Sequence, residues 1–291
     1  MRNHVIIEAP TNLGLHPGGV ENLSAALIDA GFAERLSSPV VSRVVPPPYD
    51  LVPDPETRIM NARAIAAYTR DLADSVGRAI DAGQFPIVLG GDCSILLGNV
   101  LALRRRGRFG LLFVDGHNDC YEPGTYPTGE AAAMDLAQSV GVGPEFLTNI
   151  DELRPYVRAS DTVVFGTRDS CDGHLRGRMP TPTEILEMEL SEIRHIGIDA
   201  ALSKAIQGVK RPELSGVWLH LDVDVLDDAI MPAVDYRRPD GLSWAEFETS
   251  VRTFLGSGLV VGMDVTIFNP SLDPDGSIAK DLTGCLLRCL A

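Results

Sequence analysis

The sequence has few cysteines for its length, and their spacing excludes the usual cysteine-based sites. Its 291 residues contain five, namely Cys93, Cys120, Cys171, Cys285 and Cys289. The number is odd, and no CxxC zinc-ribbon or disulfide spacing occurs. This usage predicts a reducing compartment, and we expect the protein in the cytoplasm.

Long apolar runs and positive charge are also scarce. No run approaches the roughly 18 apolar residues of a membrane span, and the apolar run in MRNHVIIEAP is too short for a signal peptide. Lys and Arg number 25 against 40 Asp and Glu, a net charge of −15. This balance opposes binding to nucleic acid or acidic lipid surfaces and favours a cation or a cationic substrate.

The chain does contain strand-like apolar runs that alternate with helical patterns. The strand candidates are residues 4–9, 85–91, 109–115, 161–167, 216–224 and 258–266, and the main helix candidates are 56–82, 94–105, 244–255 and 277–290. This alternation predicts an α/β fold with a mainly parallel sheet covered by helices on both faces. The proline-rich loop 46–55 is too short to separate domains, so we expect one domain over residues 1–291.

Polar residues cluster at three predicted strand ends, in GGDCS (90–94), DGHND (115–119) and DVDVLDD (222–228). Alternate side chains of an extended chain share a face, so Asp115 with His117, and Asp222 with Asp224, can point into one crevice, which Asp119 joins. Carboxylates held together repel unless cations neutralise them. A single DxHxD is more often a solvated loop, but neighbouring motifs favour a site for two divalent ions, with manganese or another first-row metal suited to these ligands.

These motifs make the chain resemble the arginase/agmatinase (ureohydrolase) superfamily. The resemblance extends through APTNLGLHPGGVENLSAALIDAGF (9–32), LGGDCSILLG, FVDGHNDC, FGTRDS, LHLDVDVLDDAIMPAV and MDVTIFNPSLD (263–273). It implies a three-layer α/β/α sandwich, a trimeric or hexameric homo-oligomer and a dinuclear Mn²⁺ centre. Five implied metal ligands match one for one: Asp115, His117, Asp119, Asp222 and Asp224.

The sixth implied ligand departs from the family pattern, because Cys93 stands where the family usually has histidine. A thiolate can replace an imidazole at a metal and would shift preference toward softer ions. The alternative is that Cys93 is a small buried residue and the first metal is weakly held or absent.

Other departures concern the substrate. Ile267 stands where the resemblance implies a glutamate that grips a guanidinium, and Ala132 replaces the catalytic histidine of arginases. Glu130 replaces an asparagine, Cys171 an aspartate, and Asp235 and Tyr236 lie in a segment that is threonine-rich in the family. We expect Glu130, His174, Asp235 and Ile267 to contact substrate, and we expect neither ordinary arginine nor agmatine as that substrate.

The mechanism implied by the resemblance is attack of a metal-bridging hydroxide on a guanidino or amidino carbon, followed by release of an amine. Asp119 would orient the hydroxide, and proton delivery falls to Asp119, Glu130 or water. Two hypotheses follow. The chain is either a hydrolase of a non-standard guanidino, hydroxyguanidino, amidino or ureido compound, or a non-catalytic binding or assembly subunit. His220 is expected to be a structural histidine.

Overall fold

A single parallel sheet forms the centre of the molecule. The computed structural model describes residues 3–169 and 177–291, and within them the eight strands follow the order β2-β1-β3-β8-β7-β4-β5-β6. All pairings between these strands are parallel. The strands are β1 (His4–Glu8), β2 (Val40–Arg43), β3 (Phe85–Leu89), β4 (Gly110–Val114), β5 (Thr162–Phe165), β6 (Leu186–Met188), β7 (Val217–Asp222) and β8 (Val260–Thr266).

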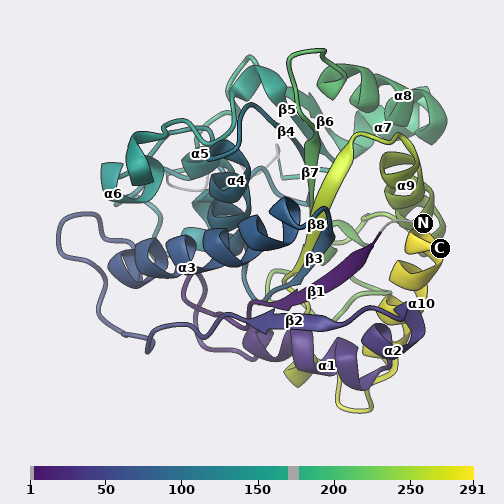
Figure 1. The fold of residues 1–291 in the computed structure, drawn as a ribbon, viewed down its shortest axis with the longest axis horizontal. Coiled ribbons are helices and arrows are strands. Elements are labelled where there is room, and N and C mark those ends of the chain that lie inside the picture. The colour runs from purple at the N-terminus through teal and green to yellow at the C-terminus, as the bar shows by residue number, and fades with distance from the viewer. Residues whose placement is uncertain (1–2, 170–176) are drawn as a thin grey trace.

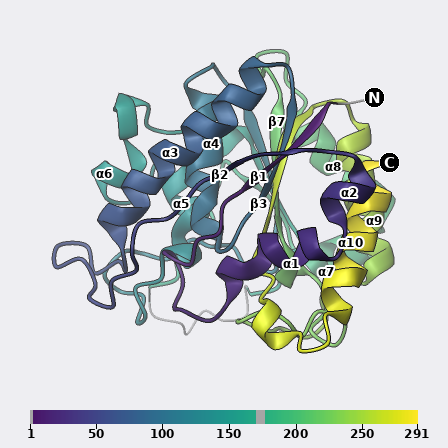
Figure 2. The same cartoon turned by 60° about the horizontal axis from the view of Figure 1, so that its bottom comes forward.

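Helices cover both faces of the sheet (Figures 1 and 2). One layer contains α3 (Ala62–Asp81), α4 (Leu96–Arg104), α5 (Asp135–Ser139) and α6 (Glu145–Thr148). The other contains α1 (Leu23–Asp29), α2 (Phe32–Leu36), α7 (Leu190–Ile196), α8 (Ile198–Val209), α9 (Trp244–Gly256) and α10 (Ser277–Leu290). Two separate hydrophobic clusters fill the spaces between the sheet and these layers. The predicted three-layer α/β/α sandwich is confirmed.

The local sequence explains the main elements. Strands β3 and β4 are buried along their whole length, as expected of central parallel strands. Helix α3 buries residues at the three- and four-residue spacing of an amphipathic helix, including Ile65, Leu72 and Val76. It begins at Ala62, later than the predicted residue 56, because Asn61 has φ 53°, outside the helical region.

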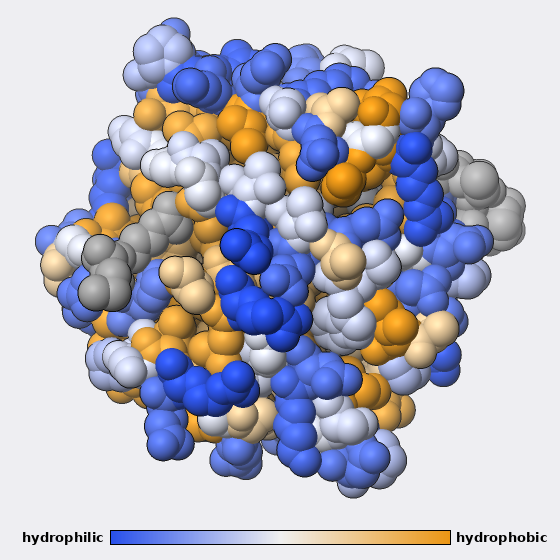
Figure 3. Space-filling model, turned by 90° about the vertical axis from the view of Figure 1, so that its right-hand side faces the viewer, coloured by the Kyte–Doolittle hydropathy of each residue, from blue (hydrophilic) through white to orange (hydrophobic). Residues whose placement is uncertain are grey.

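Two strands were missed in the sequence, and both lie at the edges of the sheet. Strand β2 is mostly exposed and β6 has only three residues, so neither has the continuous apolar run of a central strand. In the described part of the chain, no helix is both long and apolar enough to cross a membrane. Figure 3 shows the face over α9 and α10, where hydrophilic side chains are interspersed with small hydrophobic groups.

Candidate metal centre

The three predicted motifs meet at one edge of the sheet. Strands β3, β8, β7 and β4 are consecutive neighbours, so the loops that follow their carboxyl ends lie together, the usual location of ligand sites in such sheets. The loop after β3 approaches the N-terminal segment closely: a Cβ at Gly91 would lie 1.7 Å from the carbonyl oxygen of Thr11. Only glycine fits there, and this packing positions Cys93 in the short helix η2 (Cys93–Ile95).

Two groups of side chains at this edge have the composition of metal sites. One ligand atom each from Cys93, Asp115 and Asp222 lie within 4.8 Å of one another, and the same holds for Asp115, His117 and Asp224. Asp115 belongs to both groups. The structure therefore brings together five of the six predicted ligands, in two adjacent sets that share a carboxylate.

Short contacts hold these side chains in place. His117 Nδ1 lies 3.0 Å from Asp224 Oδ2, and the backbone N–H groups of His117 and Asp224 donate to Asp115 Oδ1 at 2.6 Å and to Asp222 Oδ1 at 2.7 Å. The Cys93 thiol donates to Asp222 Oδ2 at 2.9 Å. The second carboxylate oxygen of Asp115 is buried and has no hydrogen-bond partner within residues 3–169 and 177–291, as expected of an atom that can bind a cation.

The electrostatics of the site are unfavourable without a cation. Burial raises the pKa of Asp115, and raises those of Asp119 and Asp222 well above the usual range, with neighbouring carboxylates adding to each effect. Burial lowers the pKa of the His117 imidazole, but Asp224 and Asp115 outweigh this and raise it well above its usual value. The surrounding carboxylates thus favour positive charge at this position, such as that of a metal ion.

Cys93, like the neighbouring carboxylates, is buried, with 1% of its surface exposed. Burial raises the pKa of its thiol well above the usual value, and Asp222, Asp135, Asp115 and Asp119 raise it further. A thiolate at this position therefore requires a cation beside it. Carboxylates, imidazole and thiol together form a donor set that fits two divalent first-row metal ions.

Asp119 has a different environment from the other predicted ligands. It lines the pocket, but it is not part of the ligand groups found among the described residues. Burial raises the pKa of the nearby Asp135 well above the usual range, and the charge of Asp115 raises it further. Asp135 was missed in the sequence, although an aspartate at the start of a buried helix is an unusual residue that could have drawn attention.

A cavity of about 390 Å³ opens over the centre. Its lining includes Cys93, His117, Asp119, Asp222, Asp224, Glu130, Ala132, Tyr236 and Ile267. Ile267 and Ala132 therefore face the space above the candidate ligands, at the positions where the resemblance implies a glutamate and a histidine. The carboxylates in the lining are those of Asp119, Asp222, Asp224 and Glu130.

Glu130 is held by four hydrogen bonds. The backbone N–H of His16 donates to its Oε1 at 3.3 Å, and His16 Nδ1 lies 2.6 Å from the same oxygen. The hydroxyls of Thr128 and Tyr236 each donate to Oε2 at 2.6 Å. Burial raises the pKa of Glu130, but these hydrogen bonds outweigh it and leave the pKa below the usual value. Glu130 is thus an ionised carboxylate on the cavity wall.

The other predicted substrate contacts are less directly placed. Asp235 accepts two hydrogen bonds from Asn269 Nδ2, at 3.1 and 3.2 Å, and is not part of the cavity lining. Its assignment as a substrate contact stays a prediction. His174 and Cys171 lie outside the described residues.

Comparison with known proteins gives a consistent result. A model of the arginase family matches residues 32–291. The arginase of Brevibacillus brevis is 29% identical over 286 residues, covering 96% of this chain and 94% of that protein. The solved arginase of Bacillus caldovelox has TM-score 0.89 and 25% identity, covering 100% of this chain and 99% of the other. A proclavaminate amidino hydrolase of Streptomyces clavuligerus shares the fold, with TM-score 0.71, 19% identity, and coverage of 100% and 92%.

Proposed function

Because the chain belongs to the arginase family of metal-dependent hydrolases, we propose that it cleaves a C–N bond of a linear guanidino or amidino compound other than unmodified arginine or agmatine. The observation that carries the proposal is the cavity, which combines the two ligand groups with Ile267 and Ala132 in its lining. The ligand groups support hydrolysis, and the two apolar side chains support a changed substrate.

In this proposal Cys93, Asp115 and Asp222 hold one ion, and Asp115, His117 and Asp224 hold the other, with Asp119 completing the set. Two divalent ions, when bound, lower the pKa of water and so supply a nucleophile near neutral pH. Manganese is the ion that the resemblance implies, and the thiol of Cys93 shifts the preference toward softer metals.

The chain's own residues perform the remaining tasks. Asp119 lines the cavity, and in this proposal it takes the proton of the attacking water and passes it to the departing amine. Ile267 offers no charge partner, and a guanidinium buried against it would lose its solvation without compensation. A less basic group, such as a hydroxyguanidine or a ureido group, does not have this cost.

The proposed substrate specificity is tested with a panel of related compounds. Purified protein loaded with Mn²⁺ is assayed for release of urea, ammonia or amine from arginine, agmatine and their N-hydroxyguanidino, formimidoyl and ureido analogues. We expect turnover of at least one modified compound, with arginine and agmatine at about a hundredth of that rate or less, or about 2.7 kcal/mol of discrimination.

A matched pair of variants tests the role of the centre. Asp224→Asn should reduce turnover more than about a hundredfold, since even the outer partners of metal ligands are worth 10- to 100-fold, while the exposed Asp281→Asn should leave it unchanged. Metal-loaded protein that hydrolyses no compound would instead support the binding or assembly subunit.

The expected cytoplasmic location and the expected homo-oligomer remain predictions. Light scattering of the purified protein tests the oligomeric state.

A further inference from the structure

A second layer of polar side chains lies directly beneath the candidate centre. His220, on β7, precedes Asp222 by two residues and is paired in register with Phe113 of β4 and Asp264 of β8. Its side chain therefore points to the same face of the sheet as Asp222, one layer deeper. The ring is fully buried and stacks on Phe113 with ring centroids 4.7 Å apart.

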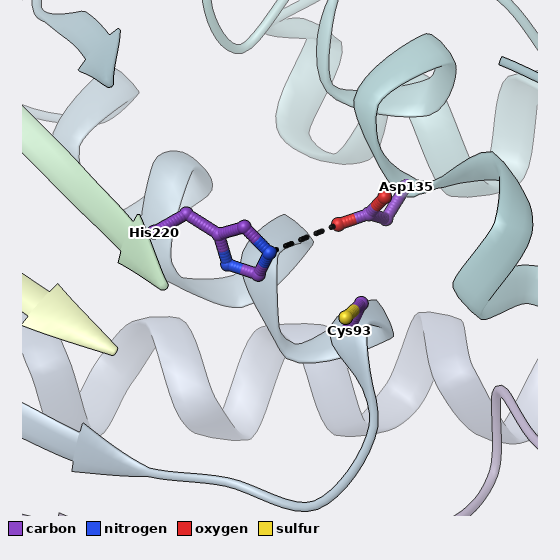
Figure 4. Close-up of side chains that lie close together, drawn as sticks. All are labelled: Cys93, Asp135 and His220. Carbon is purple, nitrogen blue, oxygen red and sulfur yellow. Dashed lines mark ion pairs between the residues drawn. The ribbon is translucent and has the colours of Figure 1, made fainter. Parts of the chain in front are cut away.

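Three elements each contribute to this layer one side chain of a kind that binds metal ions. One ligand atom each from Cys93 of η2, Asp135 at the start of α5 and His220 of β7 lie within 4.8 Å of one another. Figure 4 shows the three side chains converging, with the imidazole and the Asp135 carboxylate facing one another above the thiol. All three residues are buried.

The free atoms of this group are aimed into the space that they share. His220 Nε2 lies 3.9 Å from Asp135 Oδ2, which is too long for a hydrogen bond. Neither atom has a hydrogen-bond partner among the described residues. A buried polar atom without a partner is costly, so these two atoms facing one space point to a ligand that binds both.

The other side of the imidazole is fixed by a carboxylate. His220 Nδ1 lies 2.5 Å from Asp264 Oδ1, and Asp264 Oδ2 accepts from Trp218 Nε1 at 2.5 Å and from Asn99 Nδ2 at 2.8 Å. Asp264 is thereby held in one orientation, and it accepts a hydrogen bond from the Nδ1–H group of His220. A carboxylate on one imidazole nitrogen with the other nitrogen free is the arrangement that accompanies metal-bound histidines.

We propose that Cys93, Asp135 and His220 form a further, deeper metal-binding position, at which His220 supplies the imidazole that residue 93 does not. This proposal rests on the proposed function at one point, because Cys93 also belongs to the ion position formed with Asp115 and Asp222. One sulfur, one nitrogen and one oxygen suit a borderline ion such as Zn²⁺ or Co²⁺ better than Mn²⁺. The ligand atoms must close by about 1 Å to reach the spacing of a tetrahedral ion.

The main alternative occupant of the gap is a proton. A protonated His220 between Asp264 and Asp135 would form a buried ion pair and leave Cys93 uninvolved. The two cases differ in whether an imidazole accompanies a sulfur in the coordination of a bound ion. This can be measured by X-ray absorption at the metal edge, without reference to activity.

The decisive measurement uses His117→Ala protein loaded with Zn²⁺, because that variant lacks the imidazole of the neighbouring position. We expect one sulfur and one imidazole nitrogen around the ion, and loss of the imidazole signal in His117→Ala/His220→Gln. An ion with sulfur and no imidazole in His117→Ala, or an imidazole that persists in the double variant, would overturn the proposal. The spectrum of His117→Ala decides the matter even if the double variant does not fold.

Metal titration supplies an independent readout. With Co²⁺, the thiolate charge-transfer band should saturate at a concentration at least about 100-fold higher in His220→Gln or Asp135→Asn than in the unmodified protein, while the exposed His195→Gln and Asp199→Asn leave it unchanged. Unchanged titration in the first pair would contradict the deeper position. The dinuclear proposal fails on a different result, namely that His117→Ala and Asp224→Asn each leave total metal content unaltered.

Discussion

At the residue scale, Ile267 is unusual in both its backbone and its side chain. Its φ of 72° lies in the left-handed region, which β-branched residues rarely adopt. Its N–H donates to the Gly91 carbonyl oxygen at 2.8 Å, so the conformation is tied to the loop that carries Cys93. Such a conformation costs about 1–3 kcal/mol and persists where the surroundings impose it. The loop that carries Cys93 therefore helps to hold Ile267 in this conformation.

Ile267→Glu should restore the missing charge partner. We expect kcat/KM for agmatine and arginine to rise at least about tenfold, or about 1.4 kcal/mol of transition-state binding. Steady-state kinetics with Ile267→Gln as the uncharged control of the same length checks this. Equal effects of Glu and Gln would show that charge at this position does not limit activity.

Bound metal should change the chemical reactivity of the Cys93 thiol. A thiolate bound to metal should resist alkylation by iodoacetamide while the site is filled and react after a chelator removes the ions. Mass spectrometry of the peptide containing residue 93 measures this. Cys93→Ala should lose about one ion per chain, whereas Cys289→Ala, in α10, should lose none. Full metal content in Cys93→Ala would mean that the thiol only fills space.

At the scale of elements, Glu130 connects three separate segments of the cavity wall. His16 comes from the loop after β1, Thr128 precedes the short helix η3 (Ala131–Met134), and Tyr236 lies in the loop between β7 and α9. None of these segments has a regular strand or helix at the contact. The hydrogen bonds to the ionised Glu130 carboxylate therefore hold the three loops in position relative to one another.

Glu130→Gln should destabilise the protein in a pH-dependent way. Hydrogen bonds to a charged group are worth about 1.5–3 kcal/mol, so we expect a loss of about 2 kcal/mol at pH 7. The folded pKa lies below the ordinary value of 4.5, so this contribution is complete above pH 4.5 and disappears as the pH falls through the folded pKa.

Urea unfolding at pH 7 and below pH 4.5 measures this difference, with the exposed Glu145→Gln as control. The gap between the unmodified protein and Glu130→Gln should narrow at the lower pH. A gap that is the same at both pH values would show that the charge of Glu130 does not contribute.

At the scale of the whole molecule, negative charge is concentrated where it is most costly. The chain has a net charge of −15, and four carboxylates at the carboxyl edge of the sheet are almost fully buried: Asp115, Asp119, Asp222 and Asp224. Their mutual repulsion opposes folding unless positive charge is present. Bound metal should therefore act on global stability and not only on activity.

Removal of metal by a chelator should lower the melting temperature. An ion at a hundredfold excess over its Kd stabilises the folded state by about 2.7 kcal/mol, which corresponds to about 5 °C or more for a chain of this size. Differential scanning calorimetry with and without added Mn²⁺ or Zn²⁺ checks this. Asp224→Asn should respond less to metal than Asp281→Asn, and equal responses would contradict ion binding at the centre.

The sequence by itself determined the central strands and the pairing of Asp115 with His117 and of Asp222 with Asp224 at their ends. Buried strands and alternating ligands, such as Asp115 with His117, depend on backbone periodicity, which is a local property of the chain. The edge strands β2 and β6 escaped because their residues lack the burial that creates a recognisable pattern.

Only the tertiary structure decided how the remaining polar residues act. His220 is buried and hydrogen-bonded to Asp264, as expected of a structural histidine in a strand. The identity of that partner and the approach to Asp135 depend on the register of β7 with β8 and on the docking of α5. The left-handed backbone of Ile267 is likewise imposed by the neighbouring loop. These features arise from contacts between residues far apart in the chain, and the local periodicity of the sequence does not predict such contacts.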